Sequence, residues 1–346
     1  MKKSLLALAV LGAFAGVASA QSSVTIYGII DQSIAKGNGG TAAGALGTSE
    51  AWQVRDGGPG SRLGFRGNED LGGGLSAQFL IEHRFSPDTG ETNGAAFWMG
   101  GSYVQLTSKA AGSVYLGRWY SPIFWVSLKT DPFGYGGISQ VGSLNLANYL
   151  NPSAVGPGLR TTNTIGYKTP SLGGFTANVA VGLGENSATV GRDVGVNAEY
   201  TAGPIYVGLG YDKVNAGTST FGATTGAVDG NSVVIVGGAY NLGFMRPMAS
   251  YSKSKTRTGN AVDSDSLSFG LTAPVGPVVI KAQYTQRNTD AAPLAGVPVD
   301  VKLKKLGVGV DYFLSKRTKV YLDGAQVKET NRTNNNAFAM GVRHDF

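Results

Sequence analysis

The stretch SRLGFRGNEDLGGGLSAQFLIEHRF, residues 61–85, contains two segments of alternating polarity joined by a glycine-rich turn. In the first segment Leu63 and Phe65 alternate with Arg62 and Arg66. In the second, apolar residues at odd positions alternate with mostly polar residues at even positions. Period-two alternation is typical of β-strands with one apolar and one polar face. The stretch therefore predicts a β-hairpin with an apolar face and a charged face.

The same alternation recurs along most of the chain. Clear examples lie at 24–31, 175–184, 205–211, 267–273, 278–284 and 306–312. Counting such segments gives about sixteen strands, and bacterial outer-membrane barrels have an even number. Beyond Gln21 no stretch of about eighteen apolar residues occurs, so we expect no transmembrane helix. The pattern predicts an all-β fold, an antiparallel transmembrane β-barrel.

The connections between these segments alternate in length. Short turns with Gly or Pro lie at 69–74, 170–174, 202–204, 273–277 and 314–317, and longer polar loops at about 37–51, 86–96, 215–231, 257–264 and 289–302. Short turns at one end and long loops at the other are the layout of outer-membrane barrels. A soluble β-sandwich gives no reason for this alternation.

One connection, about 120–159, is much longer than the others. It is rich in Gly, Pro, Asn and aromatic residues and has little period-two pattern. A loop of this length in a compact protein is usually functional. We interpret it as a constriction loop folded into the lumen; a plain surface loop is the alternative.

The two ends of the chain carry export signals. Residues 1–20 begin with Lys2 and Lys3, continue through a short apolar run and end in Ala-Ser-Ala, which predicts a signal peptide cleaved before Gln21. The barrel domain is then 21–346. Phe338, Met340, Val342, His344 and Phe346 fall on one face of a final strand that ends in an aromatic residue, a pattern that resembles the assembly signal of outer-membrane barrels.

Enzymatic and nucleic-acid functions find little support. The chain has no cysteine and two histidines, His83 and His344, both at outward positions of their strands. The chain therefore has too few histidines and cysteines to favour a catalytic triad or a histidine-rich metal site. We expect no cofactor or metal. The formal net charge is +7, with the basic residues scattered rather than clustered, so no nucleic-acid groove is indicated.

Several sequence blocks resemble the general porins of β-proteobacteria such as Burkholderia and Neisseria. They are SSVTIYGIID from Ser22, residues 61–82, GSVYLGRWYSP from Gly112, NTIGYKTPSLGGF from Asn163, DYFLSKRTKVY from Asp311 and the ending GVRHDF. The resemblance implies a sixteen-stranded barrel that forms a homotrimer, with each pore narrowed by the third loop. It also implies contact with outer-membrane lipid, lipopolysaccharide and the barrel-assembly machinery, and passage of small ions and polar solutes.

Strand parity selects the side chains that should face the lumen. They are Arg62, Arg66, Glu82 and Arg84 in the opening hairpin, Asp31 on the first strand, and Arg160 and Lys168 after the long loop. Related porins carry basic residues on the wall opposite the loop, and Arg62 and Lys168 lie in the matching blocks. Residues 98–103, WMGGSY, depart from that pattern, which leaves one basic position in doubt.

The long loop is poor in charge, with only Lys129 and Asp131. Asp131 and Phe133 belong to a DPFG run that resembles the turn of constriction loops. One carboxylate opposite several basic groups predicts moderate anion preference. The alternative is that Glu82 and Asp31 neutralise the arginines. Arg118 has outward parity, and we expect a subunit interface to cover it.

Two other functions remain open. A substrate-selective channel could use the loop aromatics as a lining, although packing of the loop against the wall is the favoured interpretation. Those aromatics are Tyr120, Phe124, Trp125, Phe133 and Tyr135. An outer-membrane adhesin or enzyme ranks third.

Overall fold

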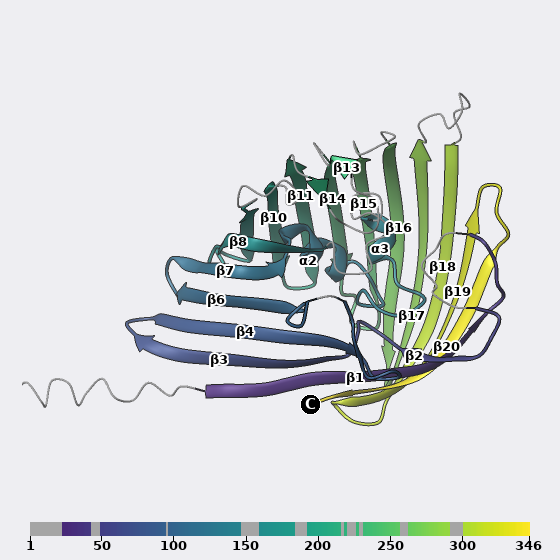
Figure 1. Ribbon diagram of the computed structural model, residues 1–346, viewed down its shortest axis with the longest axis horizontal. Helices are drawn as coiled ribbons and strands as arrows, with labels where there is room; N and C mark the ends of the chain where they lie inside the picture. The colour runs from purple at the N-terminus through teal and green to yellow at the C-terminus, as the bar shows by residue number, and fades with distance from the viewer. Residues whose placement is uncertain are drawn as a thin grey trace, which may run out of the picture.

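The computed structural model describes residues 23–42, 49–94, 96–146, 159–183, 192–215, 218–219, 226–227, 231–256, 262–290 and 300–346. Within these residues sixteen long strands form one closed antiparallel barrel (Figure 1). The expected all-β barrel with about sixteen strands is confirmed. The expected signal peptide, 1–20, lies outside the described residues.

The barrel strands follow one another around the wall in chain order. They are β1 (Ser23–Gly37), β3 (Arg62–Gly72), β4 (Leu75–Ser86), β6 (Gly101–Ser108), β7 (Gly112–Tyr120), β8 (Arg160–Lys168), β9 (Phe175–Gly182), β10 (Arg192–Ala202), β11 (Ile205–Asn215), β14 (Asn231–Tyr240), β15 (Arg246–Thr256), β16 (Val262–Val275), β17 (Val278–Asp290), β18 (Asp300–Phe313), β19 (Thr318–Glu329) and β20 (Asn335–Asp345).

Short elements lie in the connections. They are the strands β2 (Gln53–Asp56), β5 (Glu91–Thr92), β12 (Thr218–Ser219) and β13 (Gly226–Ala227), and the helices α2 (Pro122–Lys129) and α3 (Gly142–Asn145). No helix among the described residues is long and apolar enough to span a membrane. Both helices belong to the long connection between β7 and β8.

The first and last strands close the barrel. The first half of β1 pairs with β3, and residues 29–37 of β1 pair with residues 345–337 of β20. At the end of this seam the backbones of Gly28 and Phe346 exchange two hydrogen bonds, of 3.1 and 3.0 Å. A Cβ on residue 28 would lie 2.3 Å from the Phe346 ring, so only glycine leaves room for this side chain.

The outer surface is apolar and the inner surface carries most of the polar side chains. On β1, Val24 and Ile26 are 67% and 59% exposed, whereas Asp31 on the opposite face is 1% exposed. The predicted final strand behaves likewise, with Phe338, Met340, Val342 and Phe346 exposed. This arrangement suits a wall with lipid outside and water or polar groups inside.

The connections divide the barrel into a turn end and a loop end. Adjacent strands at the turn end are joined by short turns, such as that between β3 and β4, where Gly73 and Gly74 adopt positive φ. The connections at the loop end are longer, and the longest runs from Tyr120 to Arg160. The observed strands agree with the predicted alternation of turns and loops.

Candidate functional site: the narrowed channel

The connection between β7 and β8 enters the barrel and packs on its inner wall. Its helix α2 has Pro122 in the first turn, where the missing N–H breaks no helical hydrogen bond. The helix contacts β10, β11 and β14. Ile123 and Val126 form a core with Val233 and Ile235, which are 1% and 0% exposed. The expected constriction loop therefore lies in the lumen.

Glycines on the wall let the helix approach closely. A Cβ at Gly195 would lie 2.7 Å from Cδ of Pro122, and one at Gly210 would lie 3.2 Å from Cα of Ile123. The first distance is too short for any side chain, so β10 needs glycine beneath the start of the helix. The position of the loop therefore depends on glycine residues of the wall as well as on residues of the loop itself.

Asp131 fixes the turn that follows the helix. Its carboxylate accepts hydrogen bonds from the backbone N–H groups of Phe133 (2.8 Å), Tyr135 (3.2 Å), Val141 (3.0 Å) and Gly142 (3.0 Å). The side chain is buried, and burial raises the pKa of this carboxyl while the backbone donors oppose that shift. The expectation that Asp131 faces the basic wall is wrong, because its oxygens turn into the loop.

The far part of the loop is anchored to β18, β19 and the first loop. The Ser139 hydroxyl donates to the carbonyl oxygen of Gly324 at 2.8 Å, and the Gly137 N–H donates to Gly58 O at 3.3 Å. Phe133, the second expected loop residue, is buried, with its ring 4.7 Å from Nζ of Lys281. The loop therefore contacts the wall on both sides of the lumen.

Arg62, Arg84 and Arg160, the arginine cluster, surround one carboxylate. Glu82 Oε1 lies 2.7 Å from Nη2 of Arg84, and Oε2 lies 3.8 Å from Nη1 of Arg62. Tyr27 also donates to Glu82, at 3.1 Å. Two guanidinium groups thus pair with a single carboxylate, and Arg160 forms no ion pair with an acid among the described residues, which leaves a net positive charge at this point of the wall.

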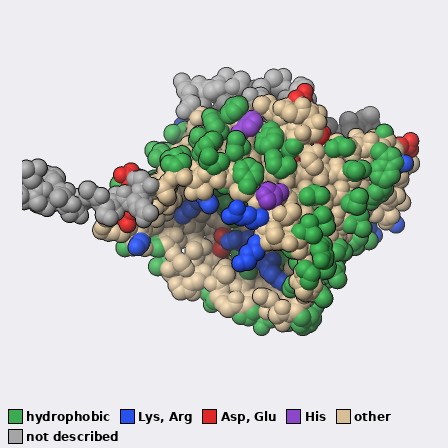
Figure 2. All heavy atoms as spheres, turned by 90° about the horizontal axis from the view of Figure 1, so that it is seen from below, with side chains coloured by type: hydrophobic (Ala, Val, Ile, Leu, Met, Phe, Trp, Pro, Cys, Tyr) green, Lys and Arg blue, Asp and Glu red, His purple; other side chains and the backbone are tan. Residues whose placement is uncertain are grey.

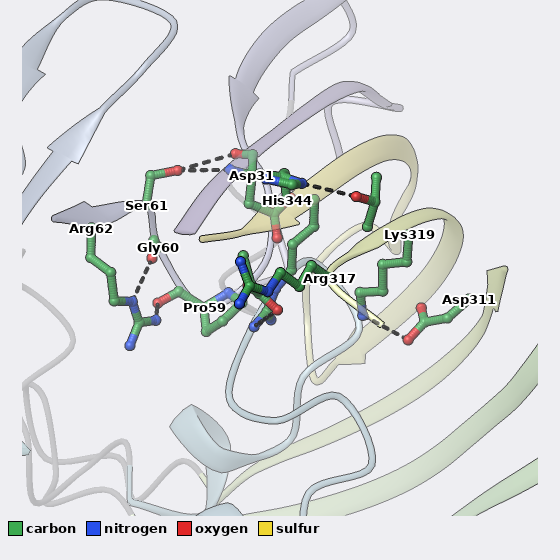
Figure 3. Close-up of polar contacts among 12 residues, drawn as sticks. Asp31, Pro59, Gly60, Ser61, Arg62, Asp311, Arg317, Lys319 and His344 are labelled. Atoms are coloured by element: carbon green, nitrogen blue, oxygen red, sulfur yellow. Dashed lines mark hydrogen bonds and ion pairs between the residues drawn. The ribbon is translucent and has the colours of Figure 1, made fainter. Parts of the chain in front are cut away.

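Neutral oxygen atoms hold the remaining guanidinium donors. The Pro59 carbonyl accepts from Arg62 Nη2 and from Arg84 Nη1, both at 2.8 Å. The Tyr120 hydroxyl accepts from Arg84 at 3.2 Å and also from Arg160, whose guanidinium lies 3.9 Å from the Tyr120 ring centroid. The segment around Pro59 is visible between Arg62 and Asp31 in Figure 3.

A β-bulge shapes the wall next to Arg160. Between β7 and β8 the pairing shifts, so that two residues, 162 and 163, stand opposite Arg118 alone. Asn163 adopts a φ of 52°, which a short polar side chain tolerates. As a result Thr161 and Thr164 are both buried, although a regular strand would place residues three positions apart on opposite faces. Arg118 is half-buried on the outer side, where Nε donates to the Met99 carbonyl at 3.0 Å.

A second charged group, which the sequence interpretation missed, lies on β17, β18 and β19. Asp311 pairs with Lys281 and with Lys319, each at 2.7 Å, and Asp323 lies 3.7 Å from Lys281. Figure 3 shows Lys319 reaching Asp311. Two lysines and two aspartates balance each other here. Strand alternation could have predicted these inward side chains, because Lys281 follows Ile280, whose side chain faces outward.

Asp31 is inward-facing but does not pair with the arginine cluster. Its carboxylate accepts a hydrogen bond from the Tyr321 hydroxyl at 2.7 Å, and its backbone N–H donates to Ser61 Oγ at 3.0 Å. Arg343, also inward and missed, pairs with Asp345 at 2.9 Å. Of the two expected lumen acids, only Glu82 contacts the arginines.

Arg66 and Lys168 lie farther toward the turn end. Arg66 lies four positions after Arg62, or about 13 Å farther along the strand. Arg66 is exposed and lines a cavity of about 340 Å³ that also touches Thr25 and Gln78. Lys168 Nζ lies 5.1 Å from the Tyr115 ring centroid. The structure does not bring these two residues into the arginine cluster.

The loop aromatics mainly pack against one another. Phe124 stacks on Tyr120 with centroids 3.9 Å apart, and Tyr135 lies 5.2 Å from Phe124. Trp125 contacts the same group at 5.3 Å from Phe124. This arrangement favours packing of the loop over an ordered aromatic lining.

Figure 2 shows the molecule from below, with Lys and Arg side chains gathered in a hollow surrounded by an apolar outer surface. A closed strand wall, apolar outside and charged inside, narrowed by a loop docked in its lumen, defines a transmembrane β-barrel channel. Among the described residues, no group of three His, Cys, Asp or Glu could hold a metal ion.

Comparisons with known proteins agree with this class. The family model for the Gram-negative porin matches residues 7–332. Outer membrane porin protein 32 of Delftia acidovorans is 34% identical over 99% of this chain and 94% of its own length, and major outer membrane protein P.IB of Neisseria lactamica is 24% identical over the full length of both. The solved structure titled anion-selective porin from Comamonas acidovorans superposes with a TM-score of 0.79 and 27% identity, over 94% of this chain and all of that one.

The chain belongs to the Gram-negative porin family. It is an outer-membrane protein and a passive diffusion channel for small hydrophilic solutes and ions, not an enzyme. The resemblance to β-proteobacterial porins is confirmed. In such barrels the turn end faces the periplasm and the loop end faces the cell exterior.

Proposed function

We propose that this porin prefers anions and that the arginine cluster sets the preference. The observation that carries the proposal is the charge count around Glu82. Arg62 and Arg84 share this one carboxylate, and Arg160 donates to the Tyr120 hydroxyl, which also accepts from Arg84. A narrow section lined by excess positive charge raises the local concentration of anions and repels cations.

Two further features support a positive pore. The one acidic residue of the long loop, Asp131, directs its oxygens to backbone N–H groups. The charged group of Lys281, Lys319, Asp311 and Asp323 is balanced, so it adds little net field. Of these three groups, the arginine cluster is the one that carries excess positive charge. Arg66 and Lys168 add positive charge toward the periplasmic mouth and, in this proposal, have the weaker effect.

The test is the reversal potential of the purified protein in a planar bilayer with a salt gradient. The wild type should favour the anion, and Arg62→Gln and Arg160→Gln should each weaken that preference. Lys168→Gln should weaken it less, and Lys304→Gln, on the outer face, should leave it unchanged. Equal reversal potentials in all variants would remove the arginine cluster from the mechanism while leaving the channel itself intact.

We also propose a homotrimer in which another subunit covers the outer face near Arg118. Arg118 Nε donates to the carbonyl of Met99, and Trp98, the residue before Met99, contacts Phe97 at 4.8 Å. An interface would shield Arg118 from lipid, where an arginine at mid-membrane costs about 2–4 kcal/mol. Thermal dissociation followed by gel mobility should show a less stable trimer for Arg118→Ala; a wild type that migrates as a monomer in mild detergent would contradict the proposal.

For biogenesis we propose cleavage before Gln21, a mature barrel domain of 21–346, and recognition of the final strand by the assembly machinery through Phe346. Support comes from the terminal pattern and from the position of Phe346 at the outer seam beside Gly28. N-terminal sequencing of the exported protein tests the cleavage site. Removal of Phe346 should reduce the yield of assembled barrel in cells more than it reduces the yield of refolded purified chain in detergent.

A further inference from the structure

A basic side chain without an acidic partner lines the cavity at the turn end of the lumen, here named the vestibule cavity. The cavity has a volume of about 340 Å³ and is formed by Arg66 and by residues of β1, β3, β4 and β6, which are neighbours in the wall (Figure 1). Arg66 is exposed, and among the described residues it forms no ion pair with a carboxylate. Its guanidinium group is therefore available to an anionic ligand.

An aromatic ring supports the side chain of Arg66. The guanidinium carbon lies 5.4 Å from the ring centroid of Tyr27, and the Tyr27 hydroxyl donates to Glu82 Oε2 at 3.1 Å. A guanidinium group that stacks on an aromatic face keeps its N–H edge free for a planar acceptor. Glu82 therefore fixes the ring beneath Arg66, while its ion pairs go to Arg62 and Arg84.

The residues around Arg66 in the cavity are neutral. Thr25 on β1 and Leu80 on β4 stand directly opposite Arg66 in the two strand pairings. One step toward the turn end, Gln78 Nε2 donates to Asn68 Oδ1 at 2.9 Å, so these two amides bond to each other. No carboxylate neutralises Arg66 from these positions of the wall.

Three aromatic side chains of the wall form an ordered group beside Arg66. Tyr103 lines the same cavity and lies two strands from Arg66 in one row of paired residues. Its ring meets Trp119 edge to face with centroids 4.9 Å apart, and Tyr115 in the same way at 6.1 Å. Gly101 leaves room for this packing, because a Cβ there would lie 2.7 Å from the Trp119 ring. The cavity thus has a preorganised aromatic side as well as a basic side.

We propose that the vestibule cavity binds planar aromatic carboxylates, such as benzoate, on their way through the channel. The carboxylate accepts two hydrogen bonds from the guanidinium group of Arg66, and the ring packs on Leu80 and Tyr103. Two strand spacings, about 10 Å, separate the backbones of Arg66 and Tyr103, which suits a carboxylate joined directly to one ring. The inference deepens the diffusion function, on which it rests, by naming a solute class.

The test measures how benzoate reduces the chloride current of the purified protein in a planar bilayer, which gives an apparent dissociation constant. Tyr103→Leu should weaken benzoate binding about five-fold, because the ring loses its aromatic contact. Arg66→Gln should weaken it about ten-fold, because the carboxylate loses a charged donor. The controls are Tyr284→Leu, on the outer face, and Arg317→Gln, at an exposed turn, and each should change binding less than about two-fold.

A second solute separates the ring from the charge. Cyclohexanecarboxylate carries the same charge without a flat ring, so it should bind the wild type more weakly than benzoate and should bind Tyr103→Leu and the wild type alike. Gel mobility with and without heating shows that each variant is folded. The reversal potential in a KCl gradient, recorded on the same channels, reports the arginine cluster separately from benzoate binding. Equal affinity of the wild type for the two solutes, or unchanged benzoate binding in Tyr103→Leu or Arg66→Gln, would overturn the proposal.

Discussion

The barrel wall has two parts with the same outer face and different inner faces. On β14, β15 and β16, the loop-bearing wall, inward positions carry mainly glycine, serine and aliphatic residues, such as Val233, Ile235 and Ser266. On β1, β3, β4 and β8, the charged wall, inward positions include Asp31, Arg62 and Glu82. The comparison shows that alternating polarity along the strands defines only an outer and an inner face of the wall. The residue types on the inner face decide whether the loop or the solute path lies against it.

The largest effect should come from removing the carboxylate that shapes the loop. Asp131→Ala leaves four buried backbone N–H groups without their acceptor, and we expect the docked loop to lose about 4 kcal/mol. Single-channel conductance should rise because the loop leaves the lumen. Asp131→Asn keeps one carbonyl oxygen and should change conductance less; a conductance equal to wild type in Asp131→Ala would rule out this role.

A smaller effect should come from the wall beneath α2. Ile235→Ala leaves a cavity against Ile123 and Val126, and we expect a loss of about 3 kcal/mol in unfolding free energy. The neighbour Val236 is 44% exposed on the outer face, so Val236→Ala should cost less than about 1 kcal/mol. Urea unfolding in lipid vesicles measures both. Equal losses would mean that the inner and outer faces of β14 contribute alike.

The hydrogen bond between Ser266 and the loop should have a modest effect. Ser266 Oγ donates to the Leu144 carbonyl at 3.3 Å, and Ser266→Ala should weaken loop docking by about 1 kcal/mol. Protease cleavage within the loop should become faster. Ser113→Ala is the control, because Ser113 Oγ contacts Thr107 and not the loop. Faster cleavage in the control variant would point to a general loosening of the barrel.

The charged wall should respond in selectivity more than in stability. Glu82→Gln removes the one carboxylate among the arginines and keeps an oxygen for Arg84. A unit charge about 10 Å from the solute path contributes about 0.4 kcal/mol in water, with opposite sign for anion and cation, so the anion-to-cation permeability ratio should rise roughly four-fold. Asp70→Asn, at a periplasmic turn, should leave the ratio unchanged. A fall in the ratio for Glu82→Gln would reverse the assumed sign of the pore field.

Strand parity predicted most of the wall because lipid on one side imposes a strict alternation. It placed Arg62, Glu82 and Arg84 on the inner face, and in the structure both arginine side chains form ion pairs with Glu82. It also applied to Lys281 and Lys319, but the sequence interpretation did not extend parity to the charged residues of these two strands.

The loop contacts could not be predicted in the same way. The run Val233–Val236 is apolar on both faces, so the sequence does not distinguish the side that meets lipid from the side that meets α2. The inward or outward direction of Asp131 depends on the path of residues 131–142, which no period describes. The bulge at Asn163 likewise shifts parity at one point, and only the pairing of β7 with β8 reveals it.

The seam between β1 and β20 has a consequence for the timing of folding. Gly37 pairs with Ala337, three hundred positions later, so ring closure requires the last strand to be available. Until then β1 has an open edge, which is a site for pairing with other chains. A chain made from its N-terminus must therefore be synthesised to its last strand before its barrel can close. Because the chain has no cysteine, the unclosed chain cannot be held in a non-native conformation by a disulfide before the barrel forms.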